Sequence, residues 1–250
     1  YEDTMKNNVA YGWHYVKLIT LGIWRPVRLQ MRGDSEMDHP FLHTAEILPD
    51  GVRTQLSLDV KHRGDAKKLQ FECKLTPKNF KGEAVVFRQD ISVSHGLNRF
   101  GFEGVFDGAK LWWPNGYGDP NLYWMECTLM DGSKVIDRFA CNWGARTIEM
   151  QPDATGPKPD KYNWQFVVNG KPIWVRGTNW CHPEAMLRLD HKRQGRFVEL
   201  AKNAHLQLIR IWGGGPVEND DLYDVCDEHG IMAQQEFSML GFHRLRNIPS

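Results

Sequence analysis

Apolar and polar residues alternate in short runs over much of the segment 41–143. LSLDV (56–60) and LQFECKL (69–75) place an apolar residue at every second position. Successive side chains of a strand point to opposite faces of its sheet, so these runs predict strands with one buried face. Turn signals such as Pro-Asp-Gly (49–51) and Asp-Gly (131–132) separate the runs. About seven short strands in roughly 110 residues, without a helical period between them, predict an antiparallel β-sandwich of immunoglobulin-like size.

Strands and helices alternate after a Pro- and Asp-rich stretch, PDATGPKPDK (152–161). We predict strands at PIWVR (172–176), LQLIRIW (206–212) and IMAQQEF (231–237). Repeated strand–helix units with nearly continuous apolar strands indicate a parallel sheet, either doubly wound or closed into an eight-stranded barrel. About three units are visible where a closed barrel needs eight over roughly 250 residues, so we expect the barrel to be incomplete in this chain.

Two helices are predicted between these strands. Asp190 is the expected N-cap of the first, on which Phe197, Ala201 and Ala204 form an apolar stripe. The second begins at Asn219 or Asp220 and ends at Gly230. Its inward residues are predicted to be Leu222, Val225 and Cys226.

Composition and charge exclude several classes of partner. The 31 basic residues balance 31 acidic ones and are scattered, so we expect no nucleic-acid or anionic-membrane partner. No apolar run approaches the roughly 18 residues of a membrane span. Five cysteines without paired spacing predict mostly buried thiols, Cys73 and Cys127 among them, in place of a disulfide framework.

We also expect neither a metal nor a cofactor. Cys181 with His182 and Cys226 with His229 match no known zinc spacing. The glycines at 213–215 lack the Lys and Ser/Thr of a phosphate-binding P-loop, and we expect a loop in which the backbone approaches a ligand or a neighbour closely.

Chemistry in parallel strand–helix folds is found at the carboxyl ends of the strands. The three predicted ends carry Asn179 and Trp180, Arg210 and Trp212, and Glu236. Aromatic faces beside amide, guanidinium and carboxylate groups suit a sugar, whose ring has apolar faces and a polar hydroxyl rim. The alternative interpretation is that these residues only pack at the rim of the sheet.

Four ordered motifs resemble glycoside hydrolase family 2, and most closely its β-mannosidase branch. They are YGWHYVKLITLGIWRPVRL (11–29), LWWPNGYGDPNLY (111–123), GARTIE (144–149) leading to FVVNGKPIWVRGTNW (166–180), and LIRIWGGGPVENDDLYDVCDEHGIMAQQEF (208–237). The resemblance covers nearly the whole chain. It implies the end of a sugar-binding jelly roll at 1–30, an immunoglobulin-like sandwich at 31–150 and the N-terminal part of a (β/α)8 TIM barrel at 151–250.

The resemblance implies a retaining exo-glycosidase that removes a terminal β-linked sugar from an oligosaccharide or glycoside, with mannose as the first expectation. Retaining hydrolysis uses two carboxyl groups about 5 to 5.5 Å apart. The family's acid/base is the Glu of an Asn-Glu pair after the fourth barrel strand, and its nucleophile is a Glu near the seventh. This chain contains no Asn-Glu pair. We therefore expect an inactive fragment whose catalytic residues lie beyond residue 250, and Glu236 is not assigned to catalysis.

What the resemblance transfers is a partial sugar subsite. Trp180, Arg210, Trp212 and Glu236 match positions that line or brace the subsite in the family, and Trp13 resembles a jelly-roll Trp that reaches into it. Two departures leave glucosaminides and galactosides open as substrates. His14 stands where β-mannosidases usually have Asp, and Gln-Gln-Glu-Phe (234–237) where they have Trp-Gln-Asp-Phe. The second hypothesis is that the sandwich is a carbohydrate-binding or interaction module of its own.

Overall fold

A computed structural model of the chain describes residues 23, 25–153, 164–183, 188–213 and 217–237. The chain forms two compact units. The sandwich unit comprises Leu29–Trp113 and Tyr117–Trp174, and the strand–helix unit comprises the described parts of Tyr1–Arg28, Pro114–Gly116 and Val175–Ser250. Of the described helices, none is long and apolar enough to cross a membrane.

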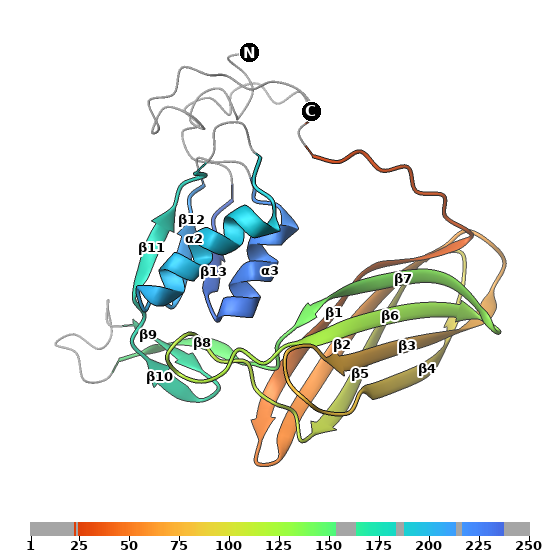
Figure 1. Cartoon of the computed structure of the whole chain (residues 1–250). Helices are drawn as coiled ribbons and strands as arrows, with labels where there is room; N and C mark the ends of the chain where they lie inside the picture. The colour runs from red at the N-terminus through yellow and green to blue at the C-terminus, as the bar shows by residue number, and fades with distance from the viewer. Residues whose placement is uncertain (1–22, 24, 154–163, 184–187, 214–216, 238–250) are drawn as a thin grey trace. The chain divides into compact units, whose positions relative to one another are not determined.

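Two antiparallel sheets make up most of the sandwich unit (Figure 1). One has the order β1-β2-β5, with bounds Ser35–Leu48, Gly51–His62 and Gly96–Asp107. The other has the order β4-β3-β6-β7, with bounds Val85–Val93, Lys67–Pro77, Tyr123–Asp131 and Lys134–Trp143. These described strands confirm that segment 41–143 is built from antiparallel strands, although the first strand starts earlier, at Ser35.

Both sheets contribute side chains to one hydrophobic core, as in a β-sandwich. Leu58 of β2 and Phe71 of β3 are fully buried, and burying such a side chain contributes about 1.5 to 3 kcal/mol. Cys73 and Cys127 face each other in the β3–β6 register and are buried, which confirms their prediction as core thiols. The indole N–H of Trp143 donates to the Leu42 carbonyl oxygen at 3.0 Å, so the two sheets also share a buried hydrogen bond.

A third, small antiparallel sheet follows the sandwich strands. Its order is β10-β9-β8, with bounds Lys171–Ile173, Trp164–Val168 and Ile148–Pro152. Asn169 and Gly170 link β9 to β10, and both have positive φ angles, 51° and 74°, as the tight turn of a hairpin requires. The strand predicted at 172–176 was wrong in extent and in partner, because its pairing ends at Ile173 within this antiparallel hairpin and the first parallel strand begins at Gly177.

Parallel strands form the sheet of the strand–helix unit. The order is β11-β12-β13, with bounds Gly177–Trp180, Leu208–Ile211 and Met232–Gln235. Helix α2 (His191–Asn203) connects β11 to β12, and α3 (Asp220–His229) connects β12 to β13. Such crossovers cover the sheet with helices (Figure 1). The predicted alternation of strands and helices is confirmed.

The helix ends follow the sequence signals. Asp190 caps α2, because its side chain accepts a hydrogen bond from the Arg193 N–H at 2.8 Å. Gly230 ends α3 in the left-handed conformation, with φ at 70°. The predicted stripe on α2 was wrong: Gln194 and Val198 are its buried residues, while Phe197 is 41% exposed. Residue Gln194 faces inward because its amide donates to Asn219 Oδ1 at 2.9 Å.

Candidate functional site

The two faces of the parallel sheet differ in what covers them. Ile209 and Ile211 of β12 pack with Val198 of α2 and Leu222 of α3 in one core. Because side chains alternate along a strand, Arg210 lies on the opposite face. In the register it stands between Asn179 and Gln234, which are also polar. The face away from the helices therefore carries hydrogen-bonding groups at the carboxyl end of the sheet.

Arg210 and Glu236 are paired on this edge. Arg210 Nε and Nη2 lie 2.8 and 2.5 Å from Glu236 Oε1. The second carboxylate oxygen, Oε2, accepts the Gly213 N–H at 3.0 Å. Arg210 Nη1 donates to Asn179 Oδ1 at 3.1 Å, so three consecutive strand ends are joined by one network.

The environment keeps Glu236 ionised. The Gly213 N–H and the Arg210 guanidinium both hydrogen-bond the carboxylate, and they hold the Glu236 pKa below its ordinary value of 4.5. Both side chains are about one-third exposed. The network thus presents a fixed cation and polar groups to a ligand, and it suits a molecule rich in hydroxyls.

The backbone at Gly213 approaches its neighbours so closely that it leaves no room for a side chain. A Cβ atom there would lie 2.6 Å from the Phe237 carbonyl oxygen and 3.1 Å from Glu236 Oε2. This agrees with the expectation of a loop that approaches a neighbour closely. The next two glycines lie outside the described residues.

The two tryptophans of the predicted subsite are buried. Trp180 is 9% exposed and Trp212 7%. The Trp180 ring packs edge-on against Phe197 of α2, with centroids 6.0 Å apart, and its indole N–H donates to Glu218 Oε1 at 2.8 Å. These placements favour packing roles, and the assignment of both rings to a sugar subsite stays a prediction. Trp13 and His14 lie outside the described residues.

Sequence reasoning missed Glu218. Its side chain is 2% exposed, and the same oxygen that accepts from Trp180 lies 2.7 Å from His182 Nδ1. Glu218 directly precedes Asn219, the N-cap of α3. The sequence shows only that Glu218 is a carboxylate in a loop between a strand and a helix. Its partner His182 is 36 residues away, and no local pattern links the two.

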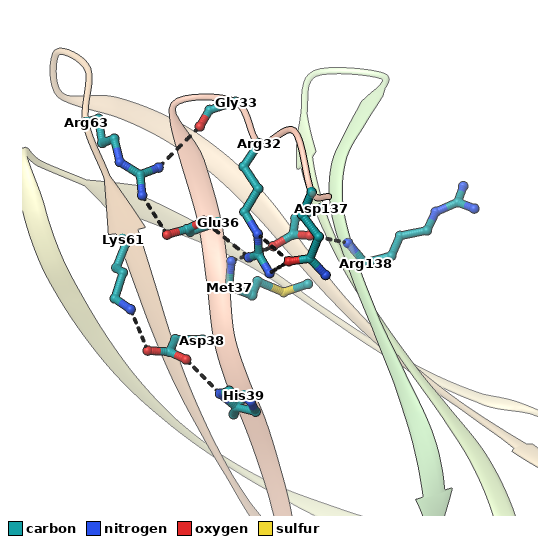
Figure 2. Close-up of polar contacts among 11 residues, drawn as sticks. Arg32, Gly33, Glu36, Met37, Asp38, His39, Lys61, Arg63, Asp137 and Arg138 are labelled. Carbon is teal, nitrogen blue, oxygen red and sulfur yellow. Dashed lines mark hydrogen bonds and ion pairs between the residues drawn. The ribbon is translucent and has the colours of Figure 1, made fainter. Parts of the chain in front are cut away.

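A pocket of about 340 Å³ with charged walls lies on the sandwich unit. Figure 2 shows that its charges are paired with one another. Glu36 contacts Arg32 at 3.2 Å and Arg63 at 2.7 Å, and Asp38 contacts Lys61 at 2.9 Å.

A third acid, Asp137 of β7, completes this cluster. Its Oδ2 accepts the Met37 N–H at 2.7 Å, which ties β1 to β7. The Arg138 side chain extends away from the other labelled residues (Figure 2). Since the acids are engaged by neighbouring cations and backbone, this cluster is best described as a structural connection between strands.

A family model described as "Glycosyl hydrolases family 2" matches residues 38–146. The chain is similar to this family over that segment. Beta-mannosidase B of Aspergillus clavatus is 30% identical over 249 residues, which are 93% of this chain and 27% of that protein. The Aspergillus oryzae beta-mannosidase B is 30% identical over 242 residues. The resemblance to family 2, and to its β-mannosidase branch, is confirmed.

Solved structures give the same relationship. The beta-D-mannosidase of Dictyoglomus thermophilum has a TM-score of 0.79 and 26% identity, and the match covers 92% of this chain and 28% of that one. The exo-chitosanase CsxA of Amycolatopsis orientalis has a TM-score of 0.65 at 21% identity, over 82% of this chain and 23% of that one. This second likeness concerns the fold alone. The chain spans about a quarter of the length of its curated relatives.

Proposed function

We propose that this chain contributes part of the terminal-sugar pocket of a retaining exo-glycosidase that acts on β-mannosides. The observation that carries the proposal is the Arg210–Glu236 pair, joined to Asn179 at the carboxyl end of the parallel sheet. Similarity to two fungal beta-mannosidases supports mannose as the sugar. An oligosaccharide or glycoside is the expected partner.

The fold supports this placement. We propose that segment 151–250 begins a (β/α)8 barrel, preceded by an immunoglobulin-like sandwich at 31–150 and the end of a jelly roll at 1–30. The order β11-β12-β13 with helical crossovers is the one expected for consecutive barrel strands. In such barrels the active site is at the carboxyl ends of the strands, which is where the Arg210 network lies.

Each residue of the network has a distinct part in binding. Glu236 holds the Arg210 guanidinium in one orientation through two contacts, so little side-chain freedom is lost when a ligand binds. The N–H groups of Arg210 and the amide of Asn179 then donate to sugar hydroxyls. Gly213 keeps the second oxygen of Glu236 in place.

Glu236 is unsuited to act as the catalytic acid. A general acid of a retaining glycosidase needs a raised pKa, whereas the pKa of Glu236 is lowered and both its oxygens already accept hydrogen bonds. The chain has no Asn-Glu pair for the acid/base role. We therefore expect binding without hydrolysis from this chain alone.

Titration of the 250-residue chain with three methyl glycosides tests the proposal and the choice of sugar. Saturable millimolar or tighter binding of methyl β-D-mannoside, above that of the β-glucosaminide and β-galactoside, is expected. Preference for one of the other two sugars would reassign the substrate. Turnover of an aryl β-mannoside by the chain would contradict the prediction that the chain alone is inactive. Mapping of bound sugar to the sandwich strands would favour a separate binding module instead.

A further inference from the structure

A buried imidazole–carboxylate pair lies just after β11, the strand that carries Asn179. His182 follows β11, and its side chain is 8% exposed, while that of Glu218 is 2% exposed. Glu218 Oε1 lies 2.7 Å from His182 Nδ1 and also accepts the Trp180 indole N–H at 2.8 Å. One oxygen therefore positions two side chains at the carboxyl edge of the parallel sheet.

The pair fixes which imidazole nitrogen carries a proton. An ionised carboxylate can only accept hydrogen bonds, so Nδ1 of His182 must donate to Glu218. In the neutral imidazole the other nitrogen, Nε2, then has a bare lone pair. Glu218 thus acts on His182 as carboxylates act on other functional histidines, by setting its tautomer and its orientation.

His182 Nε2 is the unusual atom of the network. It is covered from solvent and has no hydrogen-bond partner among the described residues. A buried polar atom without a partner is costly and calls for an explanation, such as a bound group. A hydroxyl fits this position well, because it can donate to the bare lone pair and can also accept if the ring becomes protonated.

The main chain around Glu218 is held as well. The guanidinium of Arg25 donates to the carbonyl oxygens of Val217 and Glu218, at 2.6 and 2.9 Å. This clamp limits the movement of the Glu218 backbone, so the carboxylate is a rigid support for Trp180 and His182. Rigid supports of this kind are what a precise contact to a ligand requires.

We propose that His182 is a specificity-determining residue that binds one hydroxyl of the sugar through Nε2, and that Glu218 is its positioning residue. The inference rests on the proposed function, since it takes its ligand from there. Because Nε2 is covered in the free chain, the atoms over it must move aside when the sugar binds. Only a sugar with a hydroxyl at the matching position gains from that movement, which makes the contact selective.

Nitrogen-15 NMR of the histidine rings in the 250-residue chain tests this directly, with methyl β-D-mannoside as the probe. In the free chain, Nδ1 of His182 should carry the proton that it donates to Glu218. Added sugar should move the His182 Nε2 signal. His191, an exposed histidine that lies 3.4 Å from Glu228, is the internal control and should not move.

The outcomes separate this inference from the proposed function. If the Arg210 and Asn179 side-chain signals move with sugar while His182 Nε2 stays, the inference is overturned and the proposed function stands. If none of these signals moves, both are overturned. His182→Phe should weaken binding about tenfold, the loss expected for one buried hydrogen bond, whereas His191→Phe should not. Glu218→Leu, which leaves no acceptor for the Nδ1 proton, should change the tautomer signal of His182, and an unchanged signal would refute the positioning role.

Discussion

Arg210 and Glu236 hold each other in a fixed orientation at the ends of neighbouring parallel strands. Two guanidinium nitrogens of Arg210 lie 2.8 and 2.5 Å from one oxygen of Glu236, and the Gly213 N–H lies 3.0 Å from the other. Neither side chain is deeply buried, so the pair owes its geometry to the strand register and to the Gly213 backbone.

The first prediction concerns the titration of Glu236. Its carboxyl pKa lies below 4.5 in the folded chain, so the pair's contribution to stability is present above that ordinary value and is lost as pH falls through the lowered one. Arg210→Met should raise the Glu236 pKa, but not fully to 4.5, because the Gly213 N–H still donates. Carbon-13 NMR of the carboxyl group would measure both midpoints. Equal midpoints in the two proteins would contradict the pairing.

Gly213→Ala should disrupt the same network. The added Cβ atom would lie 2.6 Å from the Phe237 carbonyl oxygen, so the strand end must shift. Overpacking of this kind costs about 1 to 3 kcal/mol of unfolding free energy. Gly101→Ala in β5 is the matched control, because a Cβ atom there meets nothing within 4 Å. Urea unfolding of both variants measures the difference, and equal midpoints would refute the close approach.

Local signals in the sequence were enough to predict the main elements. The alternation of apolar residues identified the sandwich strands, and Asp190 and Gly230 marked helix ends because caps depend only on nearby backbone. The site was harder to predict. A tryptophan such as Trp180 can stack on a sugar ring, yet packing against α2 decides which way its ring is turned. Glu218 and His182 are far apart in the sequence and come into contact only in the folded chain.

Asn115 of the Trp-Pro-Asn-Gly motif is predicted to stabilise the strand–helix unit. Its side-chain amide donates to the carbonyl oxygens of Lys202 and Leu206 at 2.9 and 3.1 Å, and so satisfies groups at the end of α2. Asn115→Ala should lower the unfolding free energy by about 1 to 3 kcal/mol. Asn203→Ala, at an exposed position of α2, is the control. A loss no larger than that of the control in denaturant unfolding would refute the role.

Thiol reactivity should follow burial. Burial raises the pKa of Cys226 to about 12, and a hydrogen bond that the Cys127 thiol donates to Cys73, together with burial, raises the pKa of Cys127. Both thiols should resist an aromatic disulfide reagent at neutral pH until the chain unfolds. Cys141 and Cys181, which are partly exposed, should react first. Mass spectrometry of labelled peptides gives the order, and early labelling of Cys226 would contradict its place in the core.

The central claim is that the Arg210 network binds the terminal sugar, and the affinity of an Arg210→Met chain for methyl β-D-mannoside tests it most directly. Arg53→Met is the control, since Arg53 also pairs with a carboxylate, Glu46 at 3.1 Å, but on the sandwich sheet. Calorimetric titration should show affinity reduced at least about tenfold by Arg210→Met, as loss of charged hydrogen bonds implies, and unchanged by Arg53→Met. Equal affinities for all three chains would contradict the account.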